Sequence, residues 1–200
     1  MSAAYELSLS AFESWDSHKK TLFNEIRVDL PRTILPGFAT FCGLSEIQKI
    51  LGRILFLWSV NTPTVSYFQG QLDLTYLFLL CFLSAHPSIS GDFRKLTKTQ
   101  IVKAIPVEFM NDCEADVFFS MSRLMSQMET SFTRDFMSGV DAMLEEMSRI
   151  VSIGDDVTWG SLLSKDCRLP DFAFRWMICL LVREFKVPRT MRLWDSYFSI

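Results

Sequence analysis

The segment Ile26–Thr33 carries a charged pair on a stiff turn. Pro31 fixes its own φ and biases Leu30 toward an extended conformation, so Arg32 is presented from a rigid backbone. Asp29 lies three residues before Arg32, where a carboxylate could orient the guanidinium group. The alternative is an exposed ion pair that contributes little to stability.

A second polar segment, Tyr67-Phe68-Gln69-Gly70, follows a loop that begins near Pro63. Gly70 has no side chain, so the backbone or a phosphate group of another molecule could approach Gln69 closely. The alternative is a polar residue near the start of a helix. Neither segment is specific enough by itself to assign an activity.

Several kinds of catalytic site are absent from the sequence. The two histidines, His18 and His86, have no second histidine at metal-ligand spacing, and the five cysteines form no Cys-x-x-Cys pair. The eight glycines form no phosphate-binding loop. We therefore expect no metal site, no nucleotide site and no self-contained enzyme.

The composition predicts a folded domain. The chain has 200 residues, of which 49% are hydrophobic and 22% charged. The net charge of −3 argues against nucleic acid as the main partner. One basic cluster comprises Arg94, Lys95, Lys98 and Lys103. We expect these residues to lie in a solvated loop, and the less favoured alternative is that they contact an anionic membrane surface.

The mean hydropathy of +0.20 raises the question of a membrane protein. The two most apolar stretches, 54–60 and 74–85, are shorter than the roughly 20 residues that a membrane-spanning helix needs, so we expect buried core helices. The amino terminus has no signal-peptide pattern, and the odd, scattered cysteines favour a reducing compartment. These features indicate a cytoplasmic protein, with a small integral membrane protein as the least favoured alternative.

Apolar residues recur at helical spacing along the chain, which predicts an all-α fold. The predicted helices cover about 44–58, 70–85, 117–128, 132–147, 162–165, 172–185 and 191–198. Arg53 is expected on an outward face, and Glu114 near the start of its helix. Arg175 lies in an otherwise apolar helix, so we expect it to be buried with a fixed carboxylate or carbonyl partner, as a core ion pair rather than a ligand contact.

Taken together and in order, these segments resemble the TBC domain, the family of Rab GTPase-activating proteins. The first signature motif matches Ile26, Asp29, Arg32 and Thr33, and the second matches Tyr67, Gln69 and Gly70. Further resemblance lies in Glu114–Phe119, Phe174–Met177 (with Arg175 and Trp176), Arg183–Phe185 and Leu193–Asp195 (with Trp194). The resemblance covers about 21–200, which leaves 1–20 as an amino-terminal extension.

The resemblance implies a multi-helix domain that accelerates GTP hydrolysis by Rab proteins in trans and regulates vesicle trafficking. Arg32 would be an arginine finger and Gln69 a glutamine finger, with Asp29 orienting Arg32 and Thr33 helping to fix the turn. Arg175, Trp176, Trp194 and Asp195 match a structural motif of the family. The protein would need no cofactor of its own, because GTP and Mg²⁺ would be bound by the GTPase. Membrane association would be peripheral, through that partner.

The sequence also departs from the family pattern. Leu72 replaces an asparagine of the second motif, and Ser66 stands where glycine is common. The sequence ends at Ile200, where members of the family continue through several helices, so we expect the carboxyl-terminal helices to be missing and an apolar face from Met191 to Phe198 to be exposed. The alternative function is therefore a non-catalytic Rab-binding or scaffold protein.

Overall fold

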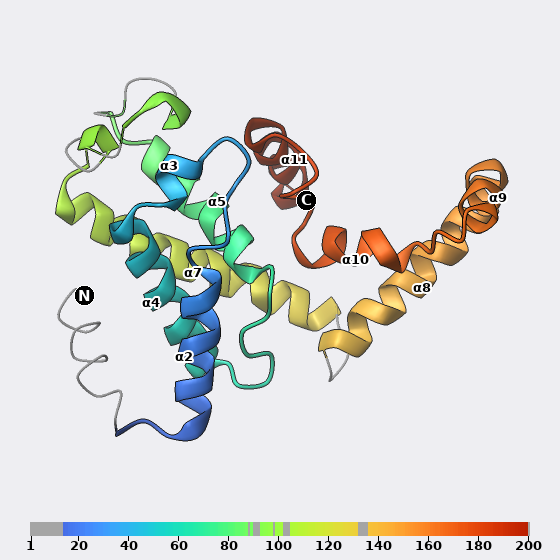
Figure 1. Ribbon diagram of the computed structural model, residues 1–200, viewed down its shortest axis with the longest axis horizontal. Helices are drawn as coiled ribbons and strands as arrows, with labels where there is room; N and C mark the ends of the chain where they lie inside the picture. The colour runs from blue at the N-terminus through green and yellow to red at the C-terminus, as the bar shows by residue number, and fades with distance from the viewer. Residues whose placement is uncertain are drawn as a thin grey trace.

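The computed structural model describes residues 14–87, 89, 93–97, 99–101, 105–131 and 136–199. All regular secondary structure in these residues is helical, which confirms the all-α prediction (Figure 1). The elements are α2 (Ser17–Asp29), α3 (Ala39–Cys42), α4 (Ser45–Asn61), α5 (Gln71–Ser84), η2 (Phe93–Lys95), α7 (Val107–Ser131), α8 (Phe136–Gly154), α9 (Asp156–Ser164), α10 (Pro170–Ile178) and α11 (Val187–Phe198).

Helix α5 is the centre of the core. It packs against α4 and α7, while α2 packs against the outer side of α4. Ten of its 14 residues are buried, as a helix that is apolar on nearly every side requires. This burial confirms the prediction that the stretch 74–85 is a core helix. No helix among the described residues combines the length and the hydropathy needed to cross a membrane.

An ion pair within the core joins α4 to α7. Arg53 Nε and Nη2 contact the two carboxylate oxygens of Glu114 at 2.7 and 2.5 Å, and the exposed fractions of the two side chains are only 12% and 3%. The prediction of an outward-facing Arg53 is therefore wrong. The helix begins at Val107, so Glu114 lies in its interior and neutralises Arg53 instead of interacting with the helix dipole.

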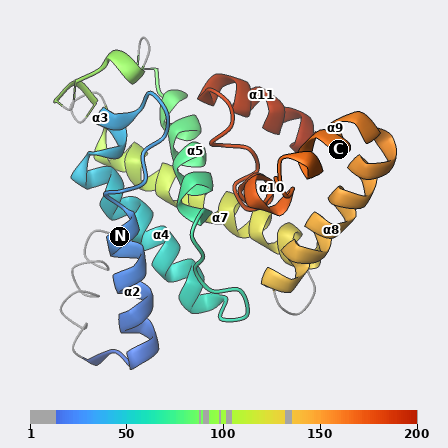
Figure 2. The ribbon, with the colours of Figure 1, turned by 45° about the vertical axis from the view of Figure 1, so that its right-hand side comes forward.

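Helices α8 and α9 form an arm. Helix α8 packs against α9 and α10, and α8 and α9 extend away from the helices α2 to α7 (Figures 1 and 2). The predicted helix over 132–147 is shifted to Phe136–Gly154, and the predicted start, Phe132, lies outside the described residues. The helix predicted over 162–165 begins earlier in the structure, at Asp156. The Asp155 carboxylate caps its start by accepting a hydrogen bond from the backbone N–H of Thr158.

The predicted continuous helix over 172–185 is wrong, because α10 ends at Ile178. Leu180 and Leu181 follow in the left-handed region, with φ of 45° and 63°. Their sequence gives no sign of this turn, since leucine rarely adopts a positive φ. Tertiary contacts hold it: the indole Nε1 of Trp194 on α11 donates to the carbonyl oxygen of Leu180 at 2.9 Å.

The apolar face from Met191 to Phe198, which the sequence predicts to be exposed, is only partly exposed. Trp194 is buried and packs against Phe78 of α5, with ring centroids 5.4 Å apart. Tyr197 and Phe198 remain 43% and 48% exposed. Trp194 therefore fastens α11 to the core, and the ring of Phe198 also stacks on Phe78, with ring centroids 6.3 Å apart.

Candidate functional site

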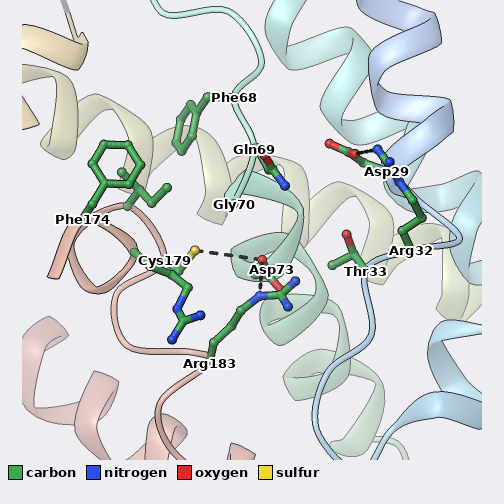
Figure 3. A pocket seen from close by; sticks show the side chains of 12 residues that line it. Asp29, Arg32, Thr33, Phe68, Gln69, Gly70, Asp73, Phe174, Cys179 and Arg183 are labelled. Atoms are coloured by element: carbon green, nitrogen blue, oxygen red, sulfur yellow. Dashed lines mark hydrogen bonds and ion pairs between the residues drawn. The ribbon is translucent and has the colours of Figure 1, made fainter. Parts of the chain in front are cut away.

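The two polar segments singled out in the sequence meet at one cleft of about 690 Å³. Its walls are the turn after α2, the loop before α5, and α10 with the connection that follows it (Figure 3). The lining residues are Asp29, Arg32, Thr33, Phe68, Gln69, Gly70, Asp73, Phe174, Arg175, Ile178, Cys179 and Arg183. Tertiary structure thus brings Arg32 and Gln69 to the same opening.

Arg32 is held in a tight turn at the end of α2. Leu30, before Pro31, is helical, with φ of −50° and ψ of −51°, so the expectation of an extended Leu30 is wrong. The backbone N–H groups of Arg32 and Thr33 donate to the carbonyl oxygen of Asp29 at 3.1 and 3.0 Å. The Arg32 guanidinium binds Asp29 Oδ1 through Nη2 at 2.6 Å, and it donates to the carbonyl oxygen of Val28 through Nε at 3.0 Å. The side chain is nevertheless 66% exposed. It is therefore oriented and still available to another molecule.

The Gln69 side chain is also exposed, and its loop depends on two unusual backbone conformations. Ser66 has a φ of 57° and Gly70 a φ of 113°. A Cβ atom on Gly70 would lie 2.9 Å from Cys179 Sγ, closer than van der Waals contact allows. Glycine is required here by both conformation and space, and Figure 3 shows Gln69 pointing toward the side of the cleft where Asp29 and Arg32 lie.

Asp29 connects the two segments. Its Oδ1 binds Arg32, while its Oδ2 accepts a hydrogen bond of 2.8 Å from the Tyr67 hydroxyl group. Burial raises the pKa of Tyr67, and the neighbouring Asp29 carboxylate raises it further, so the phenol stays protonated and donates at physiological pH. One carboxylate therefore fixes both the turn of Arg32 and the loop of Gln69.

The opposite wall of the cleft contains a pair that sequence reasoning missed. Arg183 Nε donates to Asp73 Oδ2 at 3.0 Å, and its Nη2 lies 2.9 Å from Oδ1. Asp73, in the first turn of α5, is 3% exposed. Burial raises the pKa of Asp73, while the Arg183 guanidinium acts in the opposite direction. The signal available in the sequence was a carboxylate flanked by Leu72 and Leu74, which needs a cation if it is buried.

Arg175 corrects one prediction and confirms another. Its side chain is 55% exposed, so the expectation of a buried guanidinium is wrong. It does have a fixed carboxylate partner, since its Nε and Nη2 bind Glu184 Oε1 at 2.9 and 2.6 Å. The burial prediction failed because it assumed a helix through 172–185, whereas the chain turns after Ile178 and Glu184 lies beside α10.

The other residues of the structural motif lie outside the cleft. Trp176 packs edge-on against Phe172, with ring centroids 5.0 Å apart, and lines a separate apolar hollow of about 430 Å³. Asp195 is exposed on α11, one residue after the buried Trp194. No group of three or more histidine, cysteine or acidic side chains in the described part of the chain could hold a metal ion.

The departure at Leu72 is buried in the first turn of α5 beside Gln71, whereas Ser66 lies in the loop before that helix. Leu72 is 1% exposed and packs in the core. Gln71 is fully buried, and neither its Nε2 nor its Oε1 has a hydrogen-bond partner among the described residues. Ser66 accepts a positive φ that glycine would adopt more easily. None of these departures removes the side chains of Arg32 and Gln69 from the cleft.

Comparison with known proteins points to one family. Its sequence model, described as the Rab-GTPase-TBC domain, matches residues 5–199. The chain is 31% identical over 189 residues to the GTPase-activating protein GYP1 of Saccharomyces cerevisiae, covering 92% of this chain and 29% of that protein. It is 30% identical over 186 residues to the human TBC1 domain family member 22B, covering 92% of this chain and 35% of that protein.

The fold agrees with this match. A solved structure, the crystal structure of the Ypt/Rab-GAP domain of Gyp1p, superposes with a TM-score of 0.76 at 28% identity, covering 98% of this chain and 60% of that one. The chain spans about a third of the length of the curated relatives described above. With the profile match, the shared fold and the ordered motifs in agreement, this chain belongs to the Rab-GTPase-TBC domain family.

Proposed function

We propose that this chain activates GTP hydrolysis by a Rab-family small GTPase, with Arg32 and Gln69 inserted into the active site of the partner. One observation carries the proposal: Arg32 and Gln69 are both exposed in the same cleft, and the Asp29 carboxylate joins the two segments by binding the side chains of Arg32 and Tyr67. The names of the relatives support the same activity, since GYP1 is a GTPase-activating protein.

The chemistry suits these two residue types. Phosphoryl transfer depends mainly on positioning and on stabilising charge, and a permanently charged guanidinium can neutralise charge that develops on the γ-phosphoryl group. Arg32 presents such a group while Asp29 holds its orientation. The amide of Gln69 can accept a hydrogen bond from the attacking water and donate one to a phosphate oxygen. GTP and Mg²⁺ would be bound by the GTPase, and the chain would supply no cofactor.

The partner would be a Rab protein in its GTP-bound state. A Rab substrate would also bring this chain to the surface of the endomembrane that carries the substrate, in keeping with a role in vesicle trafficking. In this proposal the chain is not an enzyme with its own substrate pocket: it completes the active site of another protein in trans.

The test is single-turnover GTP hydrolysis by a panel of Rab proteins. An arginine finger contributes about 10³- to 10⁵-fold in rate, so Arg32→Ala should abolish most of the acceleration, and Gln69→Ala should lower it strongly. Arg149→Ala is a matched control, because Arg149 forms an exposed ion pair on α8, away from the cleft. No acceleration of any Rab, or acceleration unaffected by both finger substitutions, would refute the catalytic assignment. Binding to GTP-loaded Rab without faster hydrolysis would select the non-catalytic Rab-binding alternative.

A further inference from the structure

The position of Gln69 is determined by its backbone. Its side chain is exposed and has no hydrogen bond to another described residue, unlike Arg32, which Asp29 holds directly. The loop returns to α5 through two backbone hydrogen bonds, from Gln71 N–H to the Phe68 carbonyl oxygen and from Asp73 N–H to the Gly70 carbonyl oxygen. Whatever supports this short stretch therefore supports Gln69.

The support behind the loop is the connection between α10 and α11. A Cβ on Gly70 would lie 2.9 Å from Cys179 Sγ and 3.3 Å from Ile178 Cδ1, which shows how closely the two segments pack. Four residues after Cys179, Arg183 forms the paired contact with Asp73. The connection thus contacts both ends of the Gly70–Asp73 turn, and Figure 3 marks the contacts that Cys179 and Arg183 make with Asp73.

The connection is itself held in a shape that it would not adopt alone. Leu180 and Leu181 have positive φ values, and such residues persist only where surrounding contacts impose them. Two contacts do so here: the Trp194 indole holds the Leu180 carbonyl oxygen, and Arg183 binds Asp73. The side chain of Arg183 is 37% exposed, whereas that of Asp73 is 4% exposed, so the arginine reaches inward from the cleft to a buried carboxylate.

We propose that Arg183 is a positioning residue for Gln69: through Asp73 it fastens the connection between α10 and α11 against the first turn of α5 and so fixes the backbone from which Gln69 projects. This proposal rests on the proposed function for its kinetic part. Loss of the guanidinium would leave Asp73 buried without its cation, which favours rearrangement of this turn. Arg32 is held by the Asp29 carboxylate and the Val28 carbonyl oxygen, whereas Arg183 binds Asp73, so the position of Arg32 should not depend on Arg183.

The kinetic test compares Arg183→Met in two backgrounds by single-turnover hydrolysis with a responsive Rab. In the otherwise native chain we expect a loss of about tenfold or more in the rate constant at saturation, with the apparent affinity for GTP-loaded Rab changed less than about threefold. In the Gln69→Ala background we expect the rate constant to fall by less than about threefold further, because a residue that acts through the Gln69 side chain has little effect once that side chain is absent. Equal losses in both backgrounds would overturn the proposal.

Two further variants and one control separate positioning from folding. Arg183→Lys keeps the charge near Asp73 and should restore most of the rate, whereas Asp73→Asn should reproduce the loss from the other side of the pair. Arg168→Met removes an exposed arginine whose pair with Asp171 lies outside the cleft, and it should leave the rate unchanged. Failure of Arg183→Lys to restore any rate would also contradict the proposal.

A readout without any Rab distinguishes this inference from the proposed function. Hydrogen–deuterium exchange of the Gln71 and Asp73 amides should accelerate about tenfold or more in Arg183→Met, while the amides of Arg32 and Thr33 should be unchanged. Unchanged exchange at Gln71 and Asp73 would overturn the positioning role. If exchange accelerates as expected but Gln69→Ala accelerates GTP hydrolysis by Rab as much as the native chain does, the assignment of Gln69 as a glutamine finger is refuted and the structural role of Arg183 is retained.

Discussion

Replacement of Tyr67 by phenylalanine tests whether one carboxylate connects the two segments of the site. Tyr67→Phe deletes only the hydroxyl oxygen that donates to Asp29 at 2.8 Å. A hydrogen bond to a charged partner contributes about 1.5–3 kcal/mol. Asp29 is 16% exposed, so water replaces part of the lost bond, and we expect the free energy of unfolding to fall by roughly 1–2 kcal/mol.

The same loss should be visible in hydrolysis. If the bond holds the Gln69 loop against the arginine turn, the single-turnover rate should fall by about 5- to 30-fold, which is the rate equivalent of roughly 1–2 kcal/mol. Tyr76→Phe is the matched control, because the buried Tyr76 hydroxyl group donates to the Cys42 carbonyl oxygen, outside the cleft. That carbonyl also accepts from Gln48, so the control should lose a little stability and no rate.

A double-mutant cycle gives the decisive measurement. Tyr67→Phe and Asp29→Asn are compared singly and together by urea unfolding, and direct contact predicts a coupling energy of at least about 0.5 kcal/mol. Additive effects within about 0.3 kcal/mol would refute the bridge through Asp29. So would a Tyr67→Phe variant that accelerates GTP hydrolysis by Rab as much as the native chain does.

Three other predictions concern stability and reactivity. Gln71→Met should raise the free energy of unfolding by about 1–3 kcal/mol in urea unfolding, because it removes two buried polar atoms without partners; a lower stability would show that the amide is satisfied. Glu114→Leu should cost about 3–5 kcal/mol, and adding Arg53→Met should recover much of the loss, since an unpaired buried charge is worse than none. Burial raises the pKa of the Cys42 and Cys113 thiols to about 11 and that of the Cys179 thiol to about 12. A thiol reagent at pH 8 should therefore label these three cysteines only after denaturation, whereas it should label the exposed Cys81 in the native protein.

The cysteines show that the local sequence pattern does not predict which side chains are buried. Cys81 and Cys179 both lie in apolar runs, yet Cys81 is exposed and Cys179 is buried against Gly70. Periodicity identifies that a stretch is helical and apolar, but α5 is so apolar throughout that it does not reveal which side remains open. That choice is made by the helices that pack around it.

The sequence by itself determined the helical class, the central apolar helix and the two motif segments around Arg32 and Gln69. These features follow from periodicity, from turn residues such as Pro31 and Gly70, and from residue types that suit phosphate chemistry. They are local properties, so neighbouring residues are sufficient to encode them.

Only the tertiary structure decided how the site is supported. Asp29 joins Tyr67 to Arg32, and Arg183 reaches Asp73 from a turn that no local propensity predicts. The contact of Tyr67 with Asp29 and that of Arg183 with Asp73 link residues 38 and 110 positions apart in the chain. A buried carboxylate pairs with the cation that the folded chain brings close to it. Leucines adopt a positive φ only when tertiary contacts offset the backbone strain. The physical reason is that the energy of these contacts depends on burial, which does not exist until the helices pack.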